Sequence, residues 1–300
     1  METWLQHYPY ESFIREVPDR DNPQGTPRRI PPYGQIIEHP RHLFCVEQIR
    51  RRVASMHNLG KPVPVDLFLW ATARPQRPYL TKLGGLPHRE SDRPWPQSRS
   101  GVPYTFLAQF CFADSKDISP RQLPGEVMLV FLKSKESYFA AEADDVVVEW
   151  SGLKLRKAMT LAEMPAPGFV VPELSGVIHR MNEYPESRQL FYESDISQSY
   201  LLPVTQSTKI GPVAFYIQGD PREEQTDLTL IATLSAFHLR SPRFDTDNDW
   251  QFLDMRTPVE LSRDERRGDF GRYHMSLGDM GCLYFFLNST GQVIVTMDCY

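Results

Sequence analysis

Prolines constrain this 300-residue chain more than any other feature, because 26 of them fall largely into two stretches. Seven precede residue 41, and eight more lie between residues 62 and 103. Proline fixes φ and lacks a backbone N–H, so it interrupts helices and is excluded from central strands. We expect residues 1–40 to form a Pro-rich N-terminal arm, either extended over the surface or disordered. Residues 41–300 are expected to form a single domain.

Short apolar runs, rich in β-branched and aromatic residues, dominate that domain. Each is bounded by Pro, Gly, Asp, Asn or Ser, which is typical of strands separated by turns. The runs are Val65–Ala71, Tyr104–Phe112, Val127–Leu132, Val146–Trp150, Gly168–Val171, Gln189–Tyr192, Val213–Gln218, Leu228–Leu239, Trp250–Met255, Cys282–Leu287 and Gln292–Met297. Helical spacing is clearest over residues 43–58. The pattern favours an α+β fold that is predominantly β, with a few peripheral helices.

Two segments of the chain share a short sequence pattern. Thr81-Lys82-Leu83-Gly84 recurs as Thr208-Lys209-Ile210-Gly211, and the apolar runs that follow occur in the same order at unequal spacing. Tyr104–Phe110 is matched to Trp250–Met255, and residues 125–132 to residues 281–287. Self-similarity of this kind indicates repeated supersecondary units. We therefore expect an internal duplication: two related β units, about 65–150 and 200–300, sharing one core.

Composition narrows the class of protein. The formal net charge is −5 and the hydrophobic fraction 41%. A dedicated nucleic-acid binder would carry a basic excess, and a membrane span needs about 20 apolar residues, whereas the longest apolar runs here have six. The four cysteines form no C-x-x-C pair and no secretory leader is visible. We expect a soluble cytoplasmic protein without nucleic-acid or membrane partners, and leave its oligomeric state open.

A group of motifs resembles a known family. Lys82-Leu83-Gly84-Gly85-Leu86-Pro87 is followed by Trp95-Pro96, by Phe106-Leu107-Ala108-Gln109 and by Leu123-Pro124-Gly125. Together these are similar to the YwqG-like family, a bacterial domain of unknown function, over about residues 81–287. The second copy departs from the pattern, with Gly211-Pro212 in place of Gly-Gly. The resemblance implies a fold more than a reaction, and it suggests a protein partner, for instance a toxin to be neutralised.

Four residues of these motifs are candidates for binding: Gly84, Gly85, Trp95 and Gln109. Paired glycines permit a positive φ or a close backbone approach that other residues could not make cheaply. Trp95, held between two prolines, offers a rigid apolar surface that serves either as a binding platform or as a plug over the edge of the core.

Candidate catalytic residues are sparse. His88 and Asp92 lie in the loop between Gly85 and Trp95 and could form an acid–base pair in a cleft. Solvated loop side chains are the alternative. The sequence contains no G-x-S-x-G, Walker or dinucleotide-binding motif. We therefore expect the chain not to be an enzyme, while leaving the question open.

An acidic cluster is the candidate metal site. Asp245, Asp247 and Asp249 alternate along the chain and could converge on a hard cation such as calcium. The positions where an EF-hand would carry Gly and Glu hold Trp250 and Arg256, so that motif is excluded. A solvated turn with local Asp hydrogen bonds is the alternative, and it explains the cluster better. No cofactor is predicted beyond this calcium alternative.

Three functions from different classes remain open. The first is a non-catalytic protein-binding module, favoured by an aromatic content of 12%, the rigid proline-rich loops and the lack of catalytic motifs. The second is a hydrolase that uses His88 and Asp92 or the carboxylates of Asp245–Asp249. The third is a protein that binds a small ligand or calcium.

Overall fold

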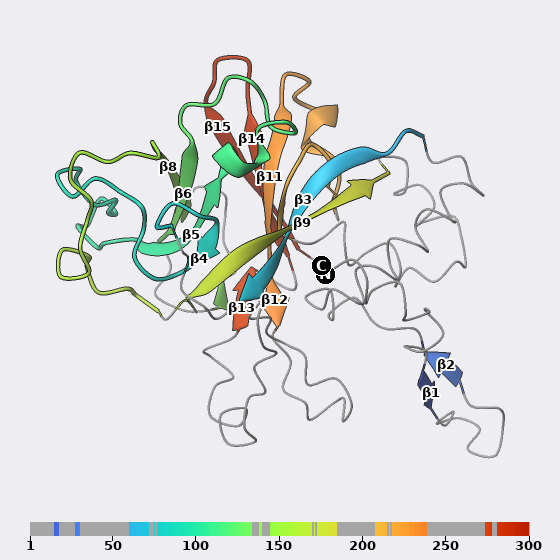
Figure 1. Cartoon of the computed structure of the whole chain (residues 1–300), viewed down its shortest axis with the longest axis horizontal. Helices are drawn as coiled ribbons and strands as arrows, with labels where there is room; N and C mark the ends of the chain where they lie inside the picture. Colours follow the sequence, from blue (N-terminus) through green and yellow to red (C-terminus); the bar gives the residue numbers. More distant parts are fainter. Residues whose placement is uncertain are drawn as a thin grey trace.

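A computed structural model describes residues 15–17, 28–30, 60–71, 75, 77–133, 138–139, 145–169, 171, 173–184, 208–214, 216, 218–238, 274–277 and 281–299. The dominant element is one antiparallel sheet of ten strands. Its order is β15-β14-β11-β10-β3-β9-β4-β5-β6-β8 (Figure 1). The strands are β3 (Val63–Ala71), β4 (Lys82–Leu83), β5 (Thr105–Cys111), β6 (Val127–Leu132), β8 (Val146–Ser151), β9 (Leu174–Glu183), β10 (Lys209–Ile210), β11 (Thr229–Ser235), β14 (Cys282–Leu287) and β15 (Val293–Asp298).

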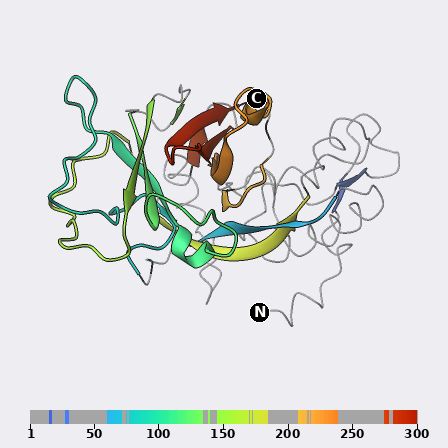
Figure 2. The ribbon, with the colours of Figure 1, turned by 90° about the horizontal axis from the view of Figure 1, so that it is seen from above.

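The sheet bends around its own core. β3 and β9 form the long central pair, and the two sets of strands on either side of it rise in the same direction (Figure 2). Phe110 on β5 and Phe285 on β14 meet across the interior, with ring centroids 5.8 Å apart. One buried cluster is completed by side chains from both sets of strands, among them Leu83, Ile210 and Leu234. Burial of each such side chain contributes about 1.5–3 kcal/mol, so this shared core holds the two sets of strands together.

Two smaller sheets accompany the main one. β1 (Arg15–Val17) pairs with β2 (Arg28–Ile30) inside the segment expected to be an arm. The second small sheet has the order β12-β13-β7, from β12 (Phe237–His238), β13 (His274–Leu277) and β7 (Tyr138–Phe139).

The expected fold class, α+β with two related units, is wrong. The described residues contain no α-helix, and their helical turns are 3-10 helices such as η3 (Phe112–Ser115) and η6 (Pro221–Glu223). Ten of the described strands form one continuous sheet in place of two units. β10, from the expected second unit, pairs directly with β3 of the first, and β9, which lies between the two units, pairs with both β3 and β4. The strands of the two expected units are therefore joined through the β10–β3 pair, and β9 is inserted between β3 and β4.

The two Thr-Lys-x-Gly segments owe their likeness to a local requirement. Each forms a two-residue strand with a buried lysine, β4 and β10. The threonine hydroxyl accepts a backbone N–H from the neighbouring strand in both cases, from Cys111 at 2.9 Å and from Ser235 at 3.1 Å. The proposed match between Tyr104–Phe110 and Trp250–Met255 cannot be followed, because residues 250–255 lie outside the described residues, as does the expected helix at 43–58.

Candidate binding pocket

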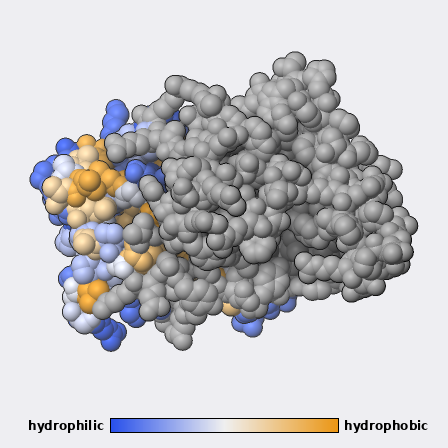
Figure 3. Space-filling view, turned by 90° about the horizontal axis from the view of Figure 1, so that it is seen from below, coloured by the Kyte–Doolittle hydropathy of each residue, from blue (hydrophilic) through white to orange (hydrophobic). Residues whose placement is uncertain are grey.

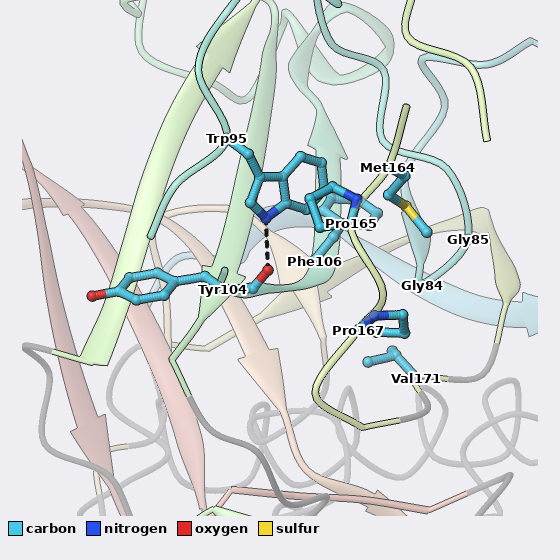
Figure 4. Close-up of a pocket in the computed structure, with 9 residues that line it drawn as sticks. All are labelled: Gly84, Gly85, Trp95, Tyr104, Phe106, Met164, Pro165, Pro167 and Val171. Atoms are coloured by element: carbon cyan, nitrogen blue, oxygen red, sulfur yellow. Dashed lines mark hydrogen bonds between the residues drawn. The ribbon is translucent and has the colours of Figure 1, made fainter. Parts of the chain in front are cut away.

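A small pocket lies on the face of β4 and β5 that points away from the core. Its volume is about 50 Å³, several times the roughly 10–15 Å³ that one water needs. The lining residues come from the turn after β4, from β5 and from the loops that cover them (Figure 4): Gly84, Gly85, Trp95, Tyr104, Phe106, Met164, Pro165, Pro167 and Val171. Three of the four predicted binding residues, Gly84, Gly85 and Trp95, thus line one cavity. Its other side is lined by Met164, Pro165, Pro167 and Val171.

Trp95 is held in place on three sides. Its indole N–H donates to the Tyr104 carbonyl over 2.8 Å, while the Tyr104 phenol points away from the cavity (Figure 4). Its ring meets Phe131 edge-on at 5.2 Å, and the Arg89 guanidinium lies 5.5 Å from the ring centroid. An aromatic ring fixed by these contacts loses little further side-chain freedom when a ligand binds. Trp95 is therefore a preorganised wall.

Arg89 anchors the covering loop to the sheet. It is 1% exposed, and its Nε donates to Glu149 on β8 over 2.7 Å. Its remaining N–H groups reach the carbonyls of Arg93 and Pro94, which immediately precede Trp95. A buried charge requires such partners, because burying it alone would cost several kcal/mol. The ion pair thereby fixes the chain on the approach to Trp95.

Gln109 lies behind the pocket instead of lining it. Its amide group donates to the carbonyls of Pro78 and Leu80 at 2.8 and 2.7 Å, and its carbonyl oxygen accepts the backbone N–H of His88 at 3.0 Å. One side chain on β5 therefore holds both ends of the 78–88 segment. Gln109 thereby supports the pocket indirectly, because the segment that it holds carries Gly84 and Gly85.

His88 and Asp92 are not brought together. His88 is buried, and its Nε2 faces the carbonyls of Gly152 and Leu153 at 3.0 and 3.2 Å, so in the neutral ring this nitrogen carries the proton and donates. Burial lowers the pKa of His88. Asp92 is exposed and accepts from Arg156 over 3.0 Å. Neither side chain is among those that line the pocket. The catalytic roles suggested for this pair remain predictions.

Other titratable groups near the sheet are shielded. The pKa of Lys82 is lowered by burial, and its ammonium donates to the Leu86 carbonyl. Burial raises the pKa of the Cys111 and Cys282 thiols to about 11, which keeps them protonated at neutral pH. No cluster of three or more His, Cys, Asp or Glu side chains able to hold a metal occurs among the described residues. Asp245, Asp247 and Asp249 lie outside them.

Sequence reasoning missed the second wall of the pocket and the ion pair beneath it. The Met164-Pro165-Ala166-Pro167 stretch carries a visible signal, since alternating prolines again stiffen the chain. Arg89 and Glu149 are 60 residues apart, and no local sequence signal indicates that they pair.

The fold and the pocket together define a β-rich protein with an aromatic- and proline-lined cavity on the outer face of its sheet. The chain belongs to the family described as a domain of unknown function, DUF1963, which matches residues 81–291. The matched segment contains every residue that lines the pocket. No curated protein matches the chain. No helix in the described part of the chain is long and apolar enough to cross a membrane.

Proposed function

We propose that this protein is an interaction module that binds an apolar side chain of a protein partner in the Trp95 pocket. The observation that carries the proposal is the chemistry of the cavity, whose walls are aromatic rings, prolines, a methionine and two glycines. Binding pockets of this kind are mostly apolar and preformed. A cavity of about 50 Å³ suits one small aliphatic side chain or the edge of a larger one.

The surface beside the pocket supports the same proposal. Leu161 is 69% exposed, an unusual position for a large apolar residue. It lies in a turn in which Glu163 accepts from the Thr160 N–H and hydroxyl at 2.8 and 2.9 Å, and this turn leads directly into Met164 of the pocket wall. Figure 3 shows hydrophobic surface on the side of the molecule where these loops lie. Exposed apolar surface next to a pocket is typical of interaction sites.

Two finer expectations accompany the proposal. One is that the chain belongs to the YwqG-like group within its family, as its Gly-Gly-x-Pro and Phe-Leu-Ala-Gln motifs suggest. The other is that the partner is a protein toxin that binding neutralises. Both rest on resemblance, and identification of the partner tests the second.

Leu161→Ser tests the proposal without disturbing the core. A partner recovered with the wild-type chain from native lysate is purified, and its dissociation constant is measured by calorimetry. Loss of this apolar contact beside the pocket should weaken binding about 10-fold. The control is Ile178→Ser, which alters the other exposed large hydrophobic residue among those described, 38% exposed and not part of the pocket lining. Equal affinity of both variants and wild type, or the absence of any stoichiometric partner, would contradict the proposal.

A further inference from the structure

β15 is the terminal strand of the ten-stranded sheet and pairs on one side with β14. The Asn288 N–H donates to the Gln292 carbonyl, which fixes the alternation of bonded pairs along this hairpin. Residues 294 and 296 therefore bond to β14, and the N–H and C=O groups of Val293, Val295 and Met297 point to the outer edge. Within the described residues, no hydrogen bond reaches those outward groups.

The two edge strands of the sheet, β8 and β15, differ in how their outward backbone groups are protected. On β8 the outward carbonyl of Trp150 accepts from the Arg93 guanidinium over 3.0 Å, which places a charge along that edge. Natural proteins protect exposed edges with charges, prolines or bulges. Val293–Met297 contains none of these: its sequence is Val-Ile-Val-Thr-Met, and its pairing with β14 shows no register shift. The β15 edge is thus suited to pairing with another strand.

The sequence of β15 indicates which strand that is. A two-fold axis through Val295 pairs Val295 with the partner's Val295, and Val293 with the partner's Met297. All three residues pack against the core from the same face, so every pair on that face is apolar. Ile294 then faces Thr296 on the other face. No charged residue lies between 293 and 297, so self-pairing brings no like charges together.

We propose that β15 pairs antiparallel with β15 of a second copy of this chain, which joins the two sheets into one. The three outward residues of each copy would exchange about six backbone hydrogen bonds across a symmetric interface. The half-buried Val293, Val295 and Met297 side chains would lose their remaining contact with water. This inference is independent of the Trp95 pocket, because no residue of β15 lines that cavity.

Val295→Pro tests the interface. Proline removes the outward N–H of Val295 and leaves the bonds to β14 in place, since they are made by residues 294 and 296. The wild type should sediment at twice the monomer mass at high micromolar concentration, and the variant as a monomer with a similar melting temperature. The control is Val148→Pro, which removes an outward N–H from the β8 edge and should stay dimeric. A monomeric wild type, or a folded Val295→Pro dimer, would overturn the proposal.

Hydrogen exchange keeps the test decisive if Val295→Pro fails to fold. In the wild type, the amides of Val293, Val295 and Met297 should exchange slowly at high protein concentration and quickly after dilution into the monomer range. The amides of Ile294 and Thr296, which bond to β14, should stay protected at both concentrations. Fast exchange of the three outward amides in a wild-type dimer would place the interface elsewhere and overturn the proposal.

Discussion

Gly85 shows how a single backbone position shapes the pocket. Its φ is +65°, in the left-handed region that glycine adopts without strain. A Cβ built there would lie 2.5 Å from Oε1 of Glu173, closer than atoms can approach. The glycine therefore permits both the turn after β4 and the passage of the Glu173 side chain over it.

Gly85→Ala should destabilise the fold by about 1–2 kcal/mol from backbone strain alone, measured by urea unfolding. The matched control is Gly101→Ala, where φ is +78° but a Cβ meets no atom within 4 Å. Because Glu173 is exposed and can rotate away, the extra cost at Gly85 should be small and should vanish in the Gly85→Ala/Glu173→Ala double variant. A larger loss at Gly101 than at Gly85 would refute this explanation.

At the scale of elements, the loop over residues 84–104 is attached to the sheet by polar contacts as well as by packing. Arg89 bonds to Glu149 on β8, and Arg93 approaches the same carboxylate at 3.4 Å. His88 bonds to the chain that leaves β8. The contacts cross from one segment to another, so β8 and the loop hold each other in place.

Glu149→Gln should cost about 3–5 kcal/mol of unfolding free energy, because it leaves the Arg89 guanidinium buried without a counter-charge. The control is Asp92→Asn, which removes the pair with Arg156 in which both side chains are exposed. Exposed pairs contribute about 0–1 kcal/mol, so the control should unfold at nearly the wild-type denaturant concentration. Equal losses in the two variants would show that the buried pair does not anchor the loop.

Which elements could be predicted from sequence depended on how they are buried. β6 and β14 match their predicted runs residue for residue, because both are continuous apolar segments with every side chain buried. β9 was missed: it carries His179 and Arg180 among apolar residues and is defined by its pairing with β3, more than 100 residues away. Conversely, Gly168 and Phe169, expected to begin a strand, belong to no strand.

The pocket, too, combines residues with a local sequence signal and residues that only long-range contacts bring in. Gly84, Gly85 and Trp95 could be identified because glycine pairs and proline-flanked tryptophans carry a conformational signal of their own. Met164 and Val171 become pocket residues only when the chain returns to the loop about 60 residues later. Local sequence does not encode that return. Three of the nine lining residues could therefore be predicted from the sequence, and the others depended on the tertiary fold.

At the scale of the whole molecule, β5 is buried on both faces. One face packs into the core that the curved sheet encloses, and the other lies under the 78–104 segment, where Phe106 forms the pocket floor. This explains why Thr105–Cys111 reads as an uninterrupted buried run instead of an alternating one. The covering segment behaves as a further layer of the fold, so loosening it should lower the stability of the entire sheet.

His88 makes the attachment of this layer dependent on pH. Burial lowers its pKa in the folded state, whereas the unfolded chain titrates near the ordinary value of about 6.5. As the pH falls through that value, the unfolded state binds a proton that the folded state does not, so stability should decline between about pH 7 and pH 5. Urea unfolding across this range measures the slope. His88→Gln keeps an N–H that can donate to the Gly152 carbonyl but cannot titrate, and should show a shallower decline. An identical slope in the variant would mean that other groups, not His88, set the acid stability of the fold.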